Sequence, residues 1–512
     1  MDDWKAIEAI CRRGWDAPNE VDLERASWFV EDPQSIRRDV WTAAAYGEGL
    51  AVRRLLAADP ALATQPGGPW NWTPILYASF SAAHELVGRG DAVIEVVAAL
   101  LEYGASSADA YEVEPGRFSA LYGALAVNGH LDRARLLVAA GAPGSDGQSL
   151  YSAVESFNID HLDLLGRAGL DPEDVSYCLL HAIDMLWDTG VSWLLNHGAA
   201  TTATHSIADE TCLHWAIKRA AGVQTIELLL DHGADPNAKT KDGRAALLPL
   251  LGTTPLDYAL RLGRPDIVEI LESRGAIRRE ATPEEAFIYA AAAGDEDEIQ
   301  DLTSDDPDLM AKLPAEDRGL VPFLAHQGAL PGVTLLCELG FDVNTTSWMG
   351  LTALHWAALR GDDEMTRTLL VYGAVMVDVG GYFGTPMDCT AHAWWQGDHA
   401  AVADLLAFAP YAGAEEDPAT LPQEPAPGPA AADPEPSSMP RREPPRSDDM
   451  LAAAFDPTDD PRAGEDEDPT EEALRAFLAH QQPVALKVGE PPSKDCAVPA
   501  GGEELAVPQE TD

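Results

Sequence analysis

The sequence is poor in basic residues, and this shortage excludes several kinds of partner. Only 34 of the 512 residues are Lys or Arg, against 85 Asp or Glu, which gives a formal net charge of −51. A chain this acidic repels the phosphates of nucleic acids and anionic membrane surfaces. We therefore expect no nucleic-acid and no membrane partner, whereas a partner attracted by charge would be basic.

Cysteine is scarce as well, and long apolar runs are missing. The six cysteines are scattered and form no CxxC pair, and a chain of this length does not need disulfide bonds to be stable. No stretch approaches the roughly 20 apolar residues that a membrane-spanning helix requires. The first twenty residues lack a basic start followed by an apolar core. These features predict a reduced, cytoplasmic protein.

Familiar catalytic motifs are also missing. The sequence contains no GxxxxGK[ST], GxGxxG, GxSxG or HExxH. Metal-binding residue types are densest in MDCTAHAWWQGDH, residues 387–399, where Asp388 and His392 stand one helical turn apart. A zinc site would need three or four such side chains to converge. We expect a protein without enzymatic activity, cofactor or metal, and keep a metal-dependent or cryptic enzyme using residues 387–399 as an alternative.

The abundant feature of the sequence is a repeated design. Each copy starts with Thr or Ser, continues as a short Ala-rich helix, passes a Gly, and ends in a Leu- and Val-rich helix followed by Gly-Ala. First halves of this kind are TPILYASF (73–80), SALYGALAVNGH (119–130), TCLHWAIKRA (211–220), TPLDYALRLGR (254–264), TALHWAALRGD (352–362) and TPMDCTAHAWW (385–395). His355 and Asp388 hold the same slot of neighbouring copies, 33 residues apart.

Each part of this design has a physical role. Thr can cap the first helix, and Pro suits the first helical turn because its missing N–H is not needed there. Leu and Val recur at helical spacing and form a buried stripe on the second helix. Gly233, Gly275 and Gly373 stand where a left-handed residue ends that helix. One unit alone cannot bury its apolar face, so neighbouring units must stack.

The TPLH-like start and the 33-residue spacing resemble the ankyrin repeat. The run GGPWNWTPILYASF, with the later LYGALAVNGH and LHWAI, is similar to a group of uncharacterised bacterial ankyrin-repeat proteins. The resemblance implies an all-α fold, an ankyrin-repeat solenoid of roughly eleven helix-turn-helix units. It also implies that His214 and His355 make loop hydrogen bonds, and that Trp215 and Trp356 face the core.

We divide the chain into four parts. Residues 1–40 are predicted to form a helical N-terminal cap, residues 41–279 a first lobe of ankyrin repeats, and residues 280–412 a second lobe. The last hundred residues, 413–512, contain 18 of the 38 prolines and 24 acidic against 7 basic residues. Their apolar content is too low to offset the entropy of ordering. We predict a disordered acidic Pro-rich tail with a short helix at 470–480, which could fold into a groove.

The resemblance implies a non-catalytic scaffold that binds another protein through the concave face of the array. In ankyrin arrays the residues just before the TPLH start form projecting fingers, and aromatic and Arg side chains are the usual anchors of interfaces. The predicted partner contacts on fingers and first helices are Trp70, Trp72, Trp348, Met349, Tyr382, Phe383, Arg360, Lys218 and Arg219. Packing between fingers is the alternative for Trp72 and Phe383. A further alternative is a self-regulated adaptor whose helix at 470–480 lies in the array's own groove.

Overall fold

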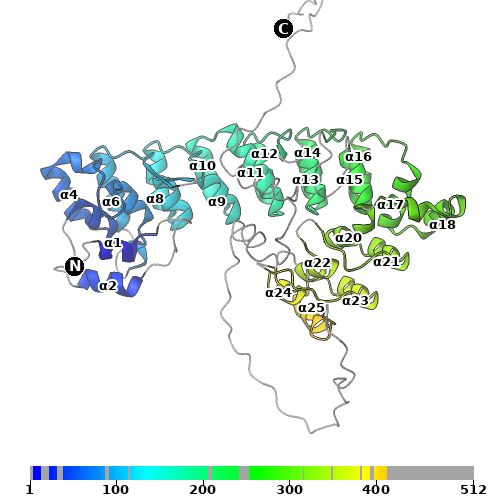
Figure 1. Ribbon diagram of the computed structural model, residues 1–512. Helices are drawn as coiled ribbons and strands as arrows, with labels where there is room; N and C mark the ends of the chain where they lie inside the picture. The colour runs from blue at the N-terminus through cyan, green and yellow to red at the C-terminus, as the bar shows by residue number, and fades with distance from the viewer. Residues whose placement is uncertain are drawn as a thin grey trace, which may run out of the picture.

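The computed structural model of the protein is a curved array of paired helices (Figure 1). It describes residues 4–12, 22–31, 39–86, 92–113, 116–205, 210–240, 253–314, 316–347, 350–380, 383–392 and 397–411. The predicted tail with its helix at 470–480 lies outside these residues, as do Trp348, Met349 and Tyr382. Among the described residues, no helix combines the length and the apolar character that crossing a membrane requires.

Two short helices, α1 (Lys5–Ile10) and α2 (Leu23–Glu31), precede a series of antiparallel helix pairs. The first seven pairs are α3 (Val40–Ala45) with α4 (Gly49–Ala58), α5 (Pro74–Phe80) with α6 (Ala92–Glu102), α7 (Ala120–Tyr122) with α8 (Leu131–Ala139), α9 (Ser149–Glu155) with α10 (Ile159–Ala168), α11 (Pro172–Asp184) with α12 (Asp188–Asn196), α13 (Cys212–Lys218) with α14 (Val223–Asp231), and α15 (Pro255–Arg261) with α16 (Pro265–Ser273). The later pairs are α17 (Pro283–Ala293) with α18 (Glu296–Asp305), α20 (Val321–Gln327) with α21 (Leu330–Glu338), α22 (Ala353–Arg360) with α23 (Asp363–Val371), and α24 (Pro386–Cys389) with α25 (His399–Leu406). The short helix α19 (Leu309–Lys312) lies between α18 and α20.

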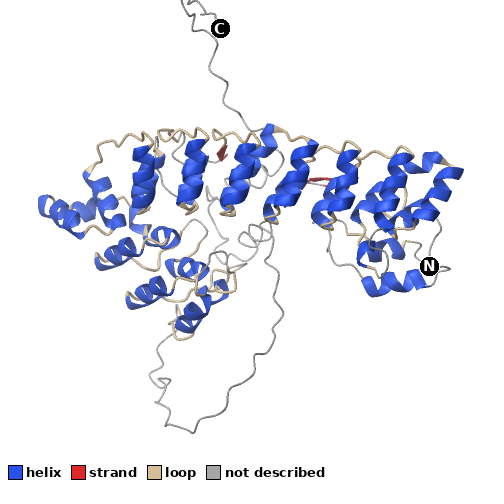
Figure 2. Cartoon of the chain, turned by 180° about the vertical axis from the view of Figure 1, so that it is seen from behind, coloured by secondary structure: helices blue, strands red, loops and turns tan. Residues whose placement is uncertain are grey.

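The all-α prediction is wrong in one respect, because the fold is mostly helical but also contains short strands. β1 (Ala110–Val113) pairs antiparallel with β2 (Gly116–Ser119), and β3 (Thr204–His205) pairs with β4 (Glu210–Thr211) (red in Figure 2). Each hairpin stands at the finger before a first helix. Strands of two to four residues are too short for an alternating pattern to stand out beside the helical repeat.

Capping by Thr, as predicted, is found at three Thr-Pro starts, and the predicted helix ends at glycine are confirmed. The Thr side chain accepts a backbone hydrogen bond, and Pro occupies the first turn, in the starts at Thr254, Thr282 and Thr385. The second helices α14, α16 and α23 are followed by glycines with left-handed φ values of 87°, 89° and 86°, at Gly233, Gly275 and Gly373. Local chemistry therefore sets the boundaries of these helices.

The buried hydrophobic side chains form two clusters. One extends from Ala6 to Leu271 and the other from Phe287 to Leu406, so the change of cluster falls near the boundary that we placed between residues 279 and 280. Phe323 of α20 packs against both clusters. In Figure 1 the helices α20–α25 turn back beneath the row that ends at α16.

Hydrogen bonds connect the returning helices to the first row. Gln327, at the end of α20, donates through Nε2 to the carbonyl oxygens of Ile217 (2.9 Å) and Lys218 (3.2 Å) at the end of α13. Arg264 Nη1 donates to the carbonyl oxygen of Ala221 and to Gln327 Oε1, both at 3.2 Å. The array therefore contacts itself at the C-terminal ends of its first helices.

Candidate partner-binding site

The first His-Trp pair is structural, as predicted. His214 Nδ1 accepts a hydrogen bond from the backbone N–H of Thr211 (3.3 Å), and Nε2 lies 3.0 Å from the carbonyl oxygen of Thr253. Burial lowers the pKa of His214 to about 4, so the imidazole is neutral at pH 7. Trp215 is buried, and its indole donates to Asp184 Oδ1 at 2.9 Å. The imidazole joins the start of α13 to the residue before the next helix start.

The second pair repeats this arrangement. His355 Nδ1 accepts from the backbone N–H of Thr352 (3.2 Å), and Nε2 lies 3.3 Å from the carbonyl oxygen of Gly384. Burial lowers the pKa of His355 to about 4. Trp356 is buried, and its indole donates to Ser347 Oγ at 2.9 Å. Both pairs therefore serve the architecture of the array.

The basic residues predicted to meet a partner at the end of α13 have internal partners. Lys218 Nζ lies 2.9 Å from Glu210 Oε2, and both side chains are at most 10% exposed. The Lys218 ammonium also stands 4.9 Å from the ring centre of Trp215. Arg219 Nε lies 2.9 Å from Asp184 Oδ1. Because these cations stabilise the array itself, we do not include them in the proposed interface.

Arg360 and Phe383 are also engaged within the array. Arg360 Nη1 donates to the carbonyl oxygen of His326 at 3.0 Å, which connects α22 to α20. Phe383 is only 2% exposed, so its position fits packing between neighbouring fingers. We leave both residues out of the interface for this reason.

The candidate metal segment, residues 387–399, uses its polar side chains to shape helices. Asp388 accepts hydrogen bonds from the backbone N–H and the hydroxyl of Thr385, both at 2.8 Å. Asp398 caps α25, and His399 Nε2 lies 3.1 Å from a backbone carbonyl oxygen of α22. Within the described residues, no three His, Cys, Asp or Glu side chains are grouped as a metal site would need.

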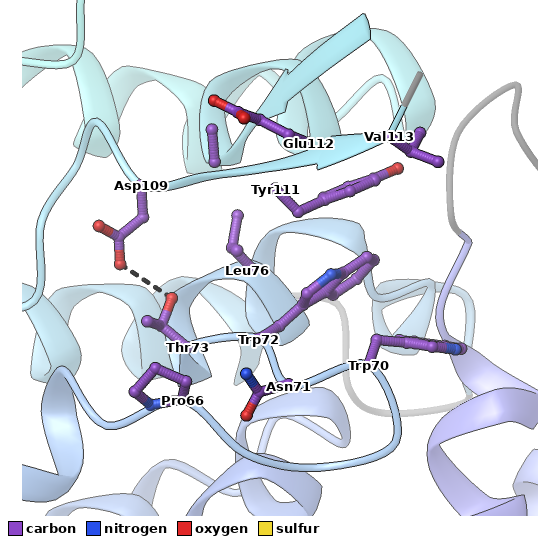
Figure 3. A pocket seen from close by; sticks show the side chains of 11 residues that line it. Pro66, Trp70, Asn71, Trp72, Thr73, Leu76, Asp109, Tyr111, Glu112 and Val113 are labelled. Carbon is purple, nitrogen blue, oxygen red and sulfur yellow. Dashed lines mark hydrogen bonds between the residues drawn. The ribbon is translucent and has the colours of Figure 1, made fainter. Parts of the chain in front are cut away.

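The remaining predicted aromatics, Trp70 and Trp72, stand at a pocket of about 430 Å³ (Figure 3). The finger before α5 contributes Pro66 and residues 70–73 to its lining, α5 contributes Leu76, and residues 109–113 contribute the opposite wall along β1. We call it the finger pocket. It forms where the finger of one repeat meets the hairpin of the next.

Stacked aromatic rings form one side of the finger pocket. The Trp72 and Tyr111 ring centres are 4.4 Å apart and their planes meet at 24°, and Trp70 lies 4.8 Å from Trp72. Trp72 is 5% and Tyr111 9% exposed. Trp72 therefore fills the contact between finger and hairpin, the alternative that the sequence left open. Trp70 is only partly buried, so a partner can reach it.

The finger before α5 lacks the hydrogen bonds of a histidine, because Leu76 occupies the position that histidine holds in other repeats. Leu76 stands three residues after Thr73, as His214 stands after Thr211 and His355 after Thr352. A leucine can make no hydrogen bond to the loop. Thr73 makes no side-chain cap to α5, and its hydroxyl instead donates to Asp109 Oδ2 at 2.8 Å (dashed line in Figure 3). The finger is thus joined to the next repeat at the pocket's edge.

The edge of the finger pocket is acidic. Glu112 is exposed and Asp109 is half-buried, and the lining residues include these two carboxylates but no Lys or Arg. Carboxylates beside aromatic rings favour a cationic group. The pocket therefore suits a basic side chain better than an acidic or purely apolar one.

Trp70 and Trp72, two of the predicted contacts, line this pocket, whereas the sequence did not lead us to Asp109, Tyr111 and Glu112, which also line it. The stretch AYEVEPGRF contains the signal that could have found them. Its alternating Tyr, Glu and Val are followed by Pro-Gly, which is typical of a turn between two strands. The helical repeat pattern on both sides hid this short hairpin.

The fold and its loop network define a helical-repeat solenoid, and comparisons with known proteins specify its class. A family model described as ankyrin repeats in three copies matches residues 179–279, and one described as an ankyrin repeat matches residues 349–379. This chain therefore contains ankyrin repeats in these two segments. Among solved structures, the crystal structure of the human ASB11 ankyrin repeat domain is similar at 22% identity; the match covers 44% of this chain and 96% of that chain, with a TM-score of 0.20. The two matched segments do not include the finger pocket.

Proposed function

We propose that this protein is a non-catalytic scaffold that binds a basic protein partner through the concave face of its array and the fingers along it. Ankyrin repeats generally mediate interactions between proteins. The observation that carries the proposal for this chain is the finger pocket, whose lining combines the partly buried Trp70 with the carboxylates of Asp109 and Glu112. The net charge of −51 would speed and orient the encounter with a basic partner.

The finger that holds Trp70 is pre-organised, which supports its use as an anchor. The backbone N–H of Trp70 donates to the Tyr77 hydroxyl (3.2 Å), and this hydroxyl donates to the carbonyl oxygen of Gly67 (2.8 Å). The rings of Trp70 and Tyr77 stack at 5.8 Å. A rigid aromatic side chain loses little entropy when it binds, and such residues dominate the energetics of interfaces.

An affinity capture with the full chain tests the proposal. The Trp70→Ala variant should retain each specific partner about tenfold less well than the natural sequence, as expected for an aromatic anchor. Phe408→Ala is the matched control, because Phe408 is a 92% exposed aromatic residue at the other end of the array. Equal retention of the same partners by both folded variants would refute this surface as the binding site.

A further inference from the structure

In the hairpin β1–β2, strand β1 has an outer edge on the side opposite to β2. In an antiparallel pair, successive residues direct their backbone groups alternately toward and away from the neighbouring strand. The N–H of Ala120 donates to the carbonyl oxygen of Asp109 (2.8 Å), and the register pairs Ala110 with Ser119. Ala110 therefore has its N–H and C=O on the outer edge, and the alternation places those of Glu112 there too.

This outer edge lies along the finger pocket. Both Ala110 and Glu112 belong to the pocket lining, and Glu112 is exposed. In the part of the chain that the structure describes, no hydrogen bond reaches the outward backbone groups of these two residues. An exposed strand edge with unpaired N–H and C=O groups is a template for another strand.

We propose that an extended basic segment of the partner protein adds to β1 as a third strand. The inference rests on the proposed function and specifies how the partner is held at the finger pocket. Main-chain hydrogen bonds to Ala110 and Glu112 hold the segment, while its alternating side chains give selectivity. The side chain of the segment that lies beside Tyr111 enters the pocket next to Asp109. The next side chain of the segment lies beside Glu112, on the other face of the hairpin.

The charges of the pocket select a basic segment. Thr73 occupies Oδ2 of Asp109 and so orients the carboxylate, which leaves Oδ1 to meet a cation. A Lys or Arg side chain can lay its methylene groups along Tyr111 while its charged end reaches Asp109. An acidic segment would instead bring like charges next to both Asp109 and Glu112, which disfavours binding.

Three labelled hexapeptides test this inference by fluorescence anisotropy with the full chain. One alternates Lys and Val, the second alternates Glu and Val, and the third is the Lys–Val peptide with every backbone amide N-methylated. We expect binding of the first peptide only, since the second has the wrong charge and the third cannot donate main-chain hydrogen bonds. Hydrogen exchange should show new protection at the Ala110 and Glu112 amides when the Lys–Val peptide is added.

Two variants separate the backbone contribution from the charge. Ala110→Pro removes an outward N–H, and Pro is tolerated on an edge strand whose N–H faces solvent; it should weaken Lys–Val binding about fivefold, the value of one hydrogen bond. Asp109→Asn keeps an oxygen for the Thr73 hydroxyl but removes the charge, and should weaken binding to a similar extent. Glu269→Gln, at an exposed acid on α16, should leave binding unchanged.

Three results would overturn strand addition: no binding of the Lys–Val peptide, equal binding of its N-methylated form, or peptide-induced protection at amides other than Ala110 and Glu112. The exchange measurement uses the natural sequence, so it decides the question even if Ala110→Pro does not fold. If Trp70→Ala loses partners in the capture experiment while folded Ala110→Pro retains them fully, the scaffold function stands and strand addition is refuted.

Discussion

The array contains two kinds of repeat start, and the residue three positions after the starting Thr distinguishes them. We call a start closed when this residue forms a hydrogen bond with the starting Thr, and open when it is apolar. In the closed starts at Thr211 and Thr352, a histidine three residues later joins its loop to a carbonyl of the next repeat. In the open start at Thr73 this slot holds Leu76, and the finger pocket lies beside it. At this start the finger is joined to the next repeat by the hydrogen bond from the Thr73 hydroxyl to Asp109 Oδ2, at the edge of the pocket.

Other repeats show that hydrogen bonding, rather than imidazole itself, closes a start. Asp257, Glu285 and Asp388 occupy the same slot, and each accepts a hydrogen bond from the backbone of the capping Thr. Among the Thr starts of the described chain, only Thr73 is followed by an apolar residue in this slot. At this start, stacking of Trp72 on Tyr111 supports the finger instead.

The largest loss of stability is expected when the histidine of a closed start is replaced by leucine, the residue that the open start at Thr73 has in this position. His355→Leu leaves the buried N–H of Thr352 and the carbonyl of Gly384 without this partner. Unsatisfied buried groups cost about 1–3 kcal/mol each, so the free energy of unfolding should fall by about 2–4 kcal/mol. Urea denaturation followed by circular dichroism measures this loss.

The control for this prediction is His232→Leu. His232 is exposed at the end of α14, where its Nδ1 lies 2.8 Å from the carbonyl oxygen of Leu228. A surface change of this kind should alter the free energy of unfolding by no more than about 0.5 kcal/mol. Losses of the same size in both variants would show that the slot has no special role.

The closed starts should also make the array sensitive to acid. Burial lowers the pKa of His355 to about 4, whereas an unfolded histidine titrates near pH 6.5. Between these two pKa values only the unfolded state binds the proton. The contribution of the neutral His355 to the free energy of unfolding is therefore complete above pH 6.5 and is lost as the pH falls toward 4. At pH 4.5 the loss for one such histidine is about 2–3 kcal/mol.

His355→Gln isolates this pH effect, because a Gln side chain can still serve a capping box but does not titrate. Urea denaturation from pH 7.5 to pH 4.5 should show a smaller decrease in the free energy of unfolding for this variant than for the natural sequence. Parallel decreases in the two proteins would contradict a role of His355 in acid sensitivity.

The smallest effect on stability is expected when the leucine of the open start is replaced by histidine, the residue of the closed starts. In Leu76→His the imidazole can meet the Thr73 N–H and the carbonyl of Phe118, which precedes the next helix start. The gained hydrogen bonds offset the lost apolar contact, so the free energy of unfolding should change by no more than about 1 kcal/mol. Binding of the Lys–Val peptide should nevertheless fall, because the ring occupies part of the finger pocket.

Leu76→Met provides the comparison for this substitution, since it keeps an apolar side chain of similar volume in the slot. It should retain peptide binding in the anisotropy measurement. If the histidine and methionine variants bind the peptide equally well, the slot does not control the finger pocket.

The parts of the fold that depend on neighbouring residues could be predicted from the sequence, whereas the site could be predicted only in part. Helix starts at Thr-Pro and helix ends at Gly233 or Gly373 follow from capping and backbone conformation within a few residues. The same reasoning selected Trp70 as a finger residue. It could not place Asp109 beside Thr73, because their hydrogen bond joins residues 36 positions apart.

The exposure of the predicted basic contacts also depended on distant parts of the chain. Lys218 was expected on an open first-helix face, but its side chain is paired with Glu210. The end of α13 is further covered by Gln327, which contacts Ile217 from 110 residues away. Whether a surface is free to bind depends on where the array turns, and repeat spacing alone does not specify that.

The amino-acid sequence by itself determined the repeated helix pair, the architectural role of the His-Trp pairs and the strongly acidic character of the protein. These properties arise from side-chain chemistry acting over one repeat or less, or from composition. Only the tertiary structure decided that Leu76 leaves a pocket open, that residues 109–113 line it, and that the later helices return to cover the end of α13. Each of these results needs backbone segments from different repeats at a defined distance, and stacking of the whole array sets that distance.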